Sequence, residues 1–213
     1  MPKPEKPRIV IFGGGGHAKV VIDIIHQQQK FAIEAIVDPV TDRQELYGYK
    51  IYPDHGQLTE GAFLVAIGDN KVRKGIFEKM CDSGWSPVAV SHPAAIVAPD
   101  VTIGAGTVIM AGAIINPATI VGENCIINTG ATIDHDCEIG SHSHIAPGCN
   151  LAGTVTTGTG VFLGIGAKVI PGIKIGQWSR AGAGAVVIEN VPEEATVAGV
   201  PARRIGAKSA AKP

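Results

Sequence analysis

Residues 120–153 read IVGENCIINTGATIDHDCEIGSHSHIAPGCNLAG, and a branched aliphatic residue recurs in this stretch at every sixth position. The same register continues in both directions, from Val97 to Val187. Fourteen of its sixteen positions hold Val, Ile or Leu, whereas chance placement within the segment predicts about four. The exceptions are Thr157 and Ala181. A six-residue repeat therefore organises this part of the chain.

A second column of small residues lies two positions before each aliphatic. Fifteen of its sixteen members, from Ala95 to Ala185, are no larger than valine. Six residues equal three strand alternations, so a turn in every unit describes short strands that meet at regular corners. Three units close a triangular coil, and successive coils stack about 4.8 Å apart. The pattern predicts a parallel β-helix whose interior is filled by the large aliphatic residues.

The cysteines fit this repeat. None of the four forms a C-x-x-C pair, and the last three (Cys125, Cys137 and Cys149) occupy the column of small residues. Their spacing of 12 residues places them on three different faces of an 18-residue coil. We therefore expect buried structural cysteines and not a metal site.

Composition excludes several classes of protein. The chain has 213 residues and a net charge of −1, which gives no electrostatic basis for binding nucleic acid. No apolar run approaches the ~20 residues that a membrane span requires, and the N-terminus lacks the apolar stretch of a signal peptide. We expect a cytoplasmic protein without nucleic-acid binding or membrane insertion.

An α/β unit precedes the repeat. We predict a Rossmann-like module over residues 1–92 and a β-helix with a C-terminal cap over residues 93–213. The second predicted helix carries Arg73, Phe77 and Met80 together on its surface. The predicted strands are 8–12, 32–37, 63–67 and 86–90, the helices are 18–29 and 71–83, and residues 91–95 are the link.

A glycine-rich turn, Gly13 to His17, joins the first strand to the first helix. Such a turn directs free N–H groups at an anion, and the helix dipole adds to the attraction. Because the glycines are consecutive and do not form G-x-G-x-x-G, a phosphate-bearing nucleotide fits better than NAD. Asp38, at the carboxyl end of the second strand, is placed to bind ribose or base. The alternative is that the glycines only form a tight turn.

Five motifs, spread over nearly the whole chain, resemble those of the bacterial nucleotide-sugar and sialic-acid O-/N-acetyltransferase family. This family includes N-acetyltransferases of UDP-4-amino sugars and of GDP-perosamine, and sialic acid O-acetyltransferases. The resemblance implies that residues 1–92 are a nucleotide-sugar-binding domain and that residues 93–213 are a left-handed β-helix acetyltransferase domain. It also implies a homotrimer, acetyl-CoA as acyl donor and no metal. The motifs are Phe12-Gly-Gly-Gly-Gly-His-Ala-Lys-Val20, Ala66-Ile-Gly-Asp-Asn-Lys-Val-Arg73, Ile133-Asp-His-Asp-Cys137, Ser143-His-Ile145 and Gly199-Val-Pro-Ala-Arg203.

The resemblance assigns the catalytic pair. His135 is the family's general base, and it is the only histidine in the corner column two positions after the aliphatic. Asp136 would orient its imidazole and favour the charged form. Many members of the family carry Glu at this position, so Asp134 remains an alternative partner.

The resemblance also assigns the binding residues. The backbone N–H of Gly153 would stabilise the thioester oxyanion, and Arg203 and Arg204 suit the phosphates of CoA. The acetyl-CoA residues are His144, Gly153, Ile165, Ala183, Arg203 and Arg204. The substrate residues are Gly14, Gly15, Gly16 and His17 for phosphate, Asp38 for ribose or base, Gly68, Asn70 and Arg73 at the border of the crevice, and Asn128 near His135.

The spacing of two histidines bears on oligomeric state. His144 follows His135 by nine residues, half of a coil, which separates them on one prism. They can share a site only across neighbouring subunits. The sequence therefore favours a trimer with active sites at its interfaces.

Several functions remain to be compared. The resemblance favours N-acetylation of the 4-amino group of a UDP- or GDP-linked amino-deoxy sugar, for surface polysaccharide or glycan synthesis. O-acetylation of sialic acid or another sugar is the alternative. A γ-type carbonic anhydrase would hold zinc through His135, His142 and His144, but their spacing and the N-terminal module argue against it. A sugar nucleotidyltransferase is disfavoured by the small N-terminal module, and a non-catalytic scaffold is the remaining class.

Overall fold

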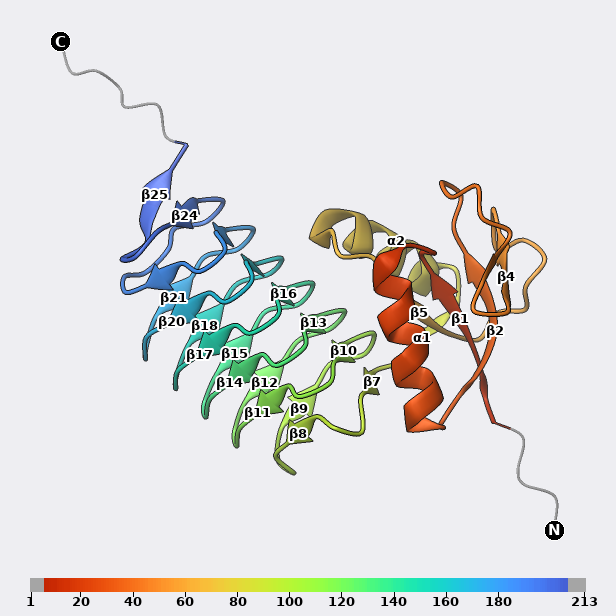
Figure 1. Ribbon diagram of the computed structural model, residues 1–213, viewed down its shortest axis with the longest axis horizontal. Coiled ribbons are helices and arrows are strands. Elements are labelled where there is room, and N and C mark those ends of the chain that lie inside the picture. Colours follow the sequence, from red (N-terminus) through yellow and green to blue (C-terminus); the bar gives the residue numbers. More distant parts are fainter. Residues whose placement is uncertain (1–5, 207–213) are drawn as a thin grey trace.

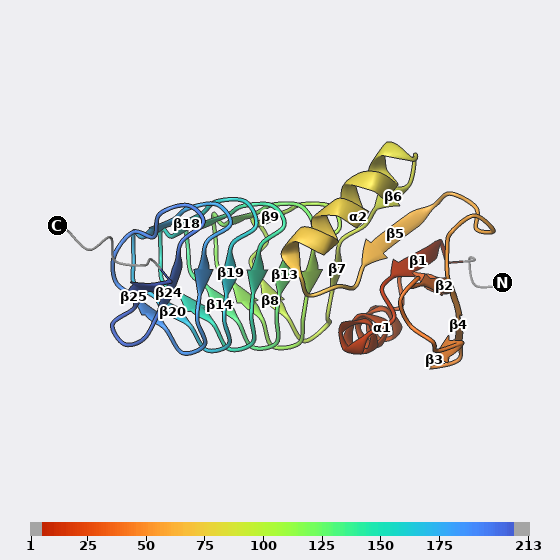
Figure 2. The same ribbon diagram turned by 90° about the horizontal axis from the view of Figure 1, so that it is seen from above.

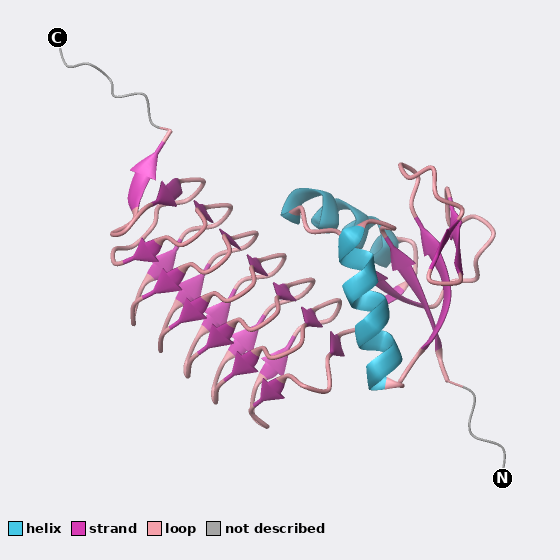
Figure 3. Ribbon diagram, in the orientation of Figure 1, coloured by secondary structure: helices cyan, strands magenta, loops and turns pink. Residues whose placement is uncertain are grey.

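The computed structural model describes residues 6–206, which form an α/β module followed by a parallel β-helix. The module lies at the end of the prism where the coils begin, and the two helices lie beside the first coils (Figures 1 and 2). Colouring by secondary structure separates the helix-containing module from the stack of short strands (Figure 3). The predicted fold class is confirmed.

The module contains one six-stranded sheet, in the order β3-β4-β2-β1-β5-β6. All its pairings are parallel except that of β3 with β4. Strands β2 and β4 are added on one side of β1, and strands β5 and β6 are added on the other side. The strand order therefore reverses at β1. Ligand crevices form at such a switch point, outside the carboxyl ends of the strands. The elements are β1 (Arg8–Phe12), α1 (Gly16–Gln28), β2 (Ala32–Val37), β3 (Glu45–Leu46), β4 (Tyr49–Tyr52), β5 (Ala62–Val65), α2 (Asn70–Asp82) and β6 (Ser86–Pro87).

Strand alternation distributes the core of the module over two layers. Ile9 and Ile11 of β1 belong to the cluster that contains α1, whereas Val10 and Phe12 belong to the cluster that contains α2. The α1 cluster also includes Val90, Val108 and Ile126 from the prism. Helix α1 is therefore packed between the sheet and the first coils, which fixes the module to the β-helix.

Three faces make up the prism. The first face contains β7 (Val90–Ser91), β10 (Val108–Ile109), β13 (Ile126–Ile127), β16 (His144–Ile145), β19 (Phe162–Leu163), β22 (Arg180–Ala181), β24 (Thr196–Ala198) and the antiparallel β25 (Arg203–Ile205). The second face contains β8 (Ile96–Val97), β11 (Ile114–Ile115), β14 (Thr132–Ile133), β17 (Asn150–Leu151), β20 (Lys168–Val169) and β23 (Val186–Val187). The third face contains β9 (Thr102–Ile103), β12 (Ile120–Val121), β15 (Glu138–Ile139), β18 (Thr156–Thr157) and β21 (Lys174–Ile175).

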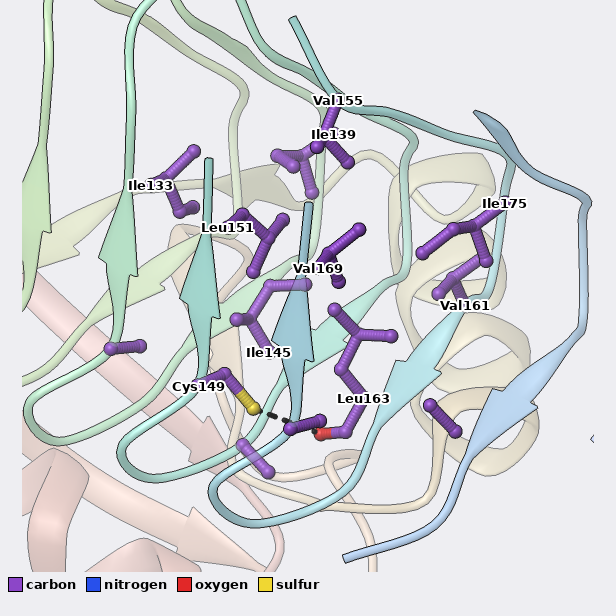
Figure 4. Packing of buried hydrophobic residues seen from close by; sticks show 14 of the residues in the cluster. Ile133, Ile139, Ile145, Cys149, Leu151, Val155, Val161, Leu163, Val169 and Ile175 are labelled. Atoms are coloured by element: carbon purple, nitrogen blue, oxygen red, sulfur yellow. Dashed lines mark hydrogen bonds between the residues drawn. The ribbon is translucent and has the colours of Figure 1, made fainter. Parts of the chain in front are cut away.

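The two residue columns fill the interior of the prism, as predicted (Figure 4). Ile133 and Ile145 are completely buried, and so are the small residues Cys125, Cys137 and Cys149. These cysteines are free, and each precedes a strand of a different face. Burial raises the pKa of the Cys125 and Cys149 thiols to about 11, so both are neutral packing residues.

The corners of the prism have a uniform backbone conformation. Every position three residues after the aliphatic column, from Gly106 to Gly184, has a positive φ. Eight of these fourteen residues are glycine, and the others include Asp136 and His142. The glycines that directly follow the aliphatic column are required for a different reason, which is the close approach of the next coil. A Cβ at Gly158, for example, would lie 2.6 Å from the backbone nitrogen of Gln177 in that coil.

Three local features differ from the expectations. Strands β3 and β4, which meet at Tyr47 and Gly48, both with positive φ, were not predicted. The predicted strand 86–90 ends at Pro87 in the module, because Val90 already belongs to β7, which pairs with β10 in the prism. Arg73, Phe77 and Met80 were expected at the surface of α2, but they are at most 5% exposed.

Candidate active site

His135 lies at the corner between β14 and β15, where the second and third faces meet. Its Nδ1 is 2.6 Å from Oδ2 of Asp136, and both side chains are more than half exposed. Asp136 occupies the left-handed region, with φ of 57°, and this turns its carboxylate back toward the preceding imidazole. The hydrogen bond from Nδ1–H to Asp136, together with the charge of Asp134, raises the pKa of His135. The Nε2 lone pair is left for a proton.

Asp134 makes different contacts. Its Oδ1 accepts hydrogen bonds from the backbone N–H of His135, at 2.8 Å, and from the side-chain amide of Asn116, at 2.9 Å. Of the two candidate carboxylates, Asp136 is therefore the one that contacts the imidazole.

Gly153 lies directly against the imidazole, one coil further along the same corner. A Cβ at this position would be 2.7 Å from Cε1 and 2.8 Å from Nε2 of His135. Only a glycine leaves the imidazole in its present position. The backbone N–H of Gly153 donates to no residue within the described part of the chain.

His144 lies on the first face, opposite the corner that carries His135, as the half-coil spacing predicts. Thr129 N–H donates to Oδ1 of Asn128, so the Asn128 amide donates from Nδ2 to Nε2 of His144, at 3.0 Å. His144 Nδ1–H then donates to the carbonyl of Gly68. Burial, reinforced by the charge of Arg73, lowers the pKa of His144 to about 4. His144 is therefore neutral, with its tautomer fixed by the module junction.

Asn128 consequently contacts His144, and not His135 of the same chain. His17 is close by, its ring centroid 6.4 Å from that of His144. Burial and the charge of Arg73 lower the pKa of His17 to about 4 as well. Its buried Nε2 has no hydrogen-bond partner among residues 6–206. His17 is thus a neutral polar group beside the glycine-rich turn.

Arg73, which we expect to border the substrate crevice, is buried at the junction between the module and the prism. Its guanidinium is 1% exposed and donates to the carbonyls of Ile67, Gly68, Asn124, His142 and Ser143, and to Oδ1 of Asn70. All three nitrogens are thereby occupied. Asn70 in turn donates from Nδ2 to the carbonyls of Gly160 and Val161. Both side chains join the module to the prism.

The glycine-rich turn is open to solvent at its second half. Gly14 N–H donates to Oδ2 of Asp38 at 2.7 Å, so this amide is already occupied. Gly15 caps α1 without a side-chain bond, and a Cβ at Gly15 or Gly16 would meet no atom within 4 Å. The first N–H groups of α1 are therefore available to an anion.

A cavity of about 390 Å³ lies at the carboxyl ends of β1 and β2. Its lining is largely apolar and includes Phe12, Val37 and Met80, with Asp38 at its edge. Asp38 is held in place because its Oδ1 accepts from the backbone of Val40 and Thr41. The cavity is therefore located at the topological switch point, next to the open end of α1.

The remaining predicted residues lie elsewhere on the prism. Ile165 and Ala183 are exposed and one coil apart on the corner between the first and second faces. Arg203 and Arg204 are exposed on β25, and Arg203 lies 3.7 Å from Glu189. A single chain therefore does not bring these residues to the corner that carries His135.

His142 completes the set of histidines considered as zinc ligands. It bonds to Asn124 and packs edge-on against Phe77. Among the described residues, no three His, Cys, Asp or Glu side chains form a group with metal-ligand geometry. Within the same residues, neither helix has the length and apolarity to cross a membrane.

A coiled prism of hexapeptide repeats with a histidine–carboxylate pair at its corner defines the class of hexapeptide-repeat acyltransferases. Two family models match the chain: "PglD N-terminal domain" over residues 8–80 and "Bacterial transferase hexapeptide (six repeats)" over residues 118–153.

Solved structures extend the match over the whole fold. PerB from Caulobacter crescentus, in complex with CoA and GDP-perosamine, is 41% identical, with a TM-score of 0.88, over 93% of this chain and 97% of that one. The acetyltransferase domain of PglB from Neisseria gonorrhoeae is 31% identical, with a TM-score of 0.89, over 94% and 100% of the chains. The chain therefore belongs to the family of nucleotide-sugar N-acetyltransferases with a PglD-type N-terminal domain and a left-handed β-helix.

Matches to curated proteins are shorter. UDP-N-acetylbacillosamine N-acetyltransferase of Bacillus subtilis is 38% identical over 113 residues, which cover 48% of this chain and 51% of that protein. Serine acetyltransferase of Haemophilus influenzae is 50% identical over 54 residues, a quarter of this chain and 20% of that protein. The matched segments thus span about half and a fifth of these relatives.

Proposed function

We propose that this protein transfers the acetyl group of acetyl-CoA to the 4-amino group of a UDP- or GDP-linked amino-deoxy sugar. The observation that carries the proposal is the His135–Asp136 pair, exposed at a corner of the prism with Gly153 directly against it. The related PerB was solved with CoA and GDP-perosamine, and the related PglB domain was solved with acetyl coenzyme A. Both relatives support a CoA thioester as the donor, and PerB supports a nucleotide-linked acceptor.

His135 acts as the general base. The acceptor amine attacks the thioester carbonyl, a C–N bond forms, and His135 Nε2 takes the proton that the nitrogen loses. When the C–S bond breaks, the imidazolium returns this proton to the sulfur of CoA. Asp136 holds Nδ1–H and stabilises the imidazolium. The free N–H of Gly153 is the donor for the transient oxyanion.

The module holds the nucleotide. Its base and ribose occupy the cavity at the ends of β1 and β2, and its diphosphate lies on the open N-terminus of α1 at Gly15, Gly16 and His17. The sugar then extends toward Gly68, His144 and Asn128. Asp38 orders the turn through Gly14 and lines the base-binding end of the cavity.

Each active site lies between two subunits of a homotrimer. His135 and the junction of His144 with Asn128 are on opposite sides of one prism, so only a neighbouring chain brings them together. CoA follows the groove between prisms, along Ile165 and Ala183 toward Arg203 and Arg204. Mixing inactive His135→Ala and His144→Ala subunits in equal amounts should restore about a quarter of wild-type activity, because one interface in four is intact.

We place the reaction in the cytoplasm, as a step in surface polysaccharide or glycan synthesis. All four cysteines are free, which agrees with a reducing compartment.

The test is an acetyl-CoA assay against UDP-, GDP- and dTDP-linked 4-amino sugars, with sialic acid and free serine as further acceptors. We expect acetylation of a nucleotide-linked amine and its loss in His135→Ala. Acetylation of sialic acid alone would identify an O-acetyltransferase and remove the role of the open α1 terminus. His135→Ala with full activity would refute the assignment of the base.

A further inference from the structure

The corner that carries His135 is braced by a side chain from the preceding coil. Asn116 lies 18 residues before Asp134, and its Nδ2 donates to Oδ1 of Asp134 at 2.9 Å. The same oxygen accepts the backbone N–H of His135 at 2.8 Å. A single carboxylate oxygen therefore connects the preceding coil to the backbone of the residue that bears the imidazole.

We propose that Asn116 is a positioning residue for the acetyl transfer, acting through Asp134 on the backbone of His135. The inference rests on the proposed function of His135 as the base. It assigns separate tasks to the two carboxylates: Asp136 orients the imidazole, and Asp134 with Asn116 holds the peptide from which the imidazole projects.

Exposure explains why such a brace is needed. The His135 side chain is 56% exposed, so packing within the chain restrains it little. It is restrained by the short bond to Asp136, by contact with Gly153, and by the position of its own backbone. A rotation of the His135 peptide would carry the imidazole away from the reacting amine, and such displacements are costly in rate.

The charge distribution agrees with this assignment. The hydrogen bond from Asn116, followed by that from His135 N–H, lowers the pKa of Asp134, so the carboxylate is the form that the two donors stabilise. The neighbouring coils present Pro117 and Gly153 at this corner, and neither carries a charge. Asn116 has an amide and no charge of its own, so its effect on His135 must pass through Asp134.

The experiment is a double-mutant cycle between Asn116→Ala and Asp134→Ala, measured as steady-state kinetics of the full-length protein. We expect each single change to lower kcat about tenfold with little change in KM, the usual range for residues that orient a catalytic group. The double variant should be no slower than the slower single variant, because the two residues act as one unit. Asp134→Asn keeps an acceptor oxygen and should restore most of kcat.

The matched control is Asn150→Ala. Asn150 also spans two coils of the second face through its side chain, donating to Oγ1 of Thr132 at 2.9 Å, but it does not contact the His135 corner. Its removal should leave kcat within about twofold of wild type, a typical result for a surface substitution. Losses that multiply in the double variant, or an Asn116→Ala variant as active as Asn150→Ala, would overturn the proposal.

Amide hydrogen exchange at His135 gives a second readout that does not depend on activity. The His135 N–H should exchange faster in Asn116→Ala, where its acceptor is free to move, and in Asp134→Ala, where its acceptor is removed, than in wild type or Asn150→Ala. Unchanged exchange in Asn116→Ala would refute the brace. Failure of the wild-type protein to acetylate any amine would refute the proposed function while leaving this result intact.

Discussion

Replacing Gly153 by alanine tests the geometry of the proposed base. The new Cβ would lie 2.7 Å from Cε1 and 2.8 Å from Nε2 of His135, well inside the 3.5–4.0 Å of optimal carbon contacts. The imidazole must therefore move by about 1 Å, which its own chain allows because the side chain is 56% exposed within it. A displacement of this size at a catalytic group costs about a hundredfold in rate.

We therefore expect Gly153→Ala to lower kcat about a hundredfold while the melting temperature and the trimer are retained. Steady-state acetylation with saturating acetyl-CoA measures the loss. In a His135→Ala background, Gly153→Ala should have no further effect, because no imidazole remains to be displaced. Gly61→Ala is the matched control, since its Cβ would meet only the carbonyl of Thr59 at 3.9 Å. Wild-type kcat in Gly153→Ala would refute the placement of the imidazole.

Three further predictions concern charge and stability. Asp136→Asn removes the main cause of the raised pKa of His135, so the acidic limb of kcat/KM should move to lower pH; a limb that stays in place would exclude His135 as the base. Arg73→Met should lower the free energy of unfolding by about 3 kcal/mol or more, because buried carbonyls of the module and of the prism lose their donor. Chemical denaturation measures this free energy, and a change below about 1 kcal/mol would contradict the proposal that Arg73 joins the module to the prism. His17 and His144 have folded pKa values of about 4 against an ordinary 6.5, so the unfolded chain binds more protons between these values. Stability should therefore fall by about 1.4 kcal/mol per pH unit for each histidine as pH drops from 6.5 to 4, and His144→Phe should reduce this slope by about half.

The prism could be predicted because each hexad repeats the same physical requirement. The aliphatic and small columns encode the core directly, and His135 stands out as the single histidine of its corner column. The left-handed conformation of the corner residues is also predictable, because glycine predominates three positions after the aliphatic residue.

The junction between module and prism could not be predicted from local pattern. The contact of His144 with Gly68 joins residues 76 positions apart, and no periodicity encodes it. Arg73 shares one side of α2 with Phe77 and Met80, but a charged residue is normally predicted to be exposed. Only the carbonyls that surround its guanidinium in the folded chain make its burial favourable. Asp136 contacts the imidazole through a local left-handed turn, whereas Asp134 is held by Asn116 of the preceding coil, a contact that no local pattern encodes.

The most direct test of the central claim is the chemical position of the transferred acetyl group. Acetyl-CoA labelled with ¹³C in the acetyl carbonyl is incubated with the protein and a nucleotide-linked 4-amino sugar, and the product is examined by heteronuclear NMR. We predict that the product holds an amide carbonyl coupled to the proton at C4 of the sugar, and that wild type forms it but His135→Ala does not. An ester carbonyl on a sugar oxygen, or an amide formed equally well by His135→Ala, would contradict this prediction.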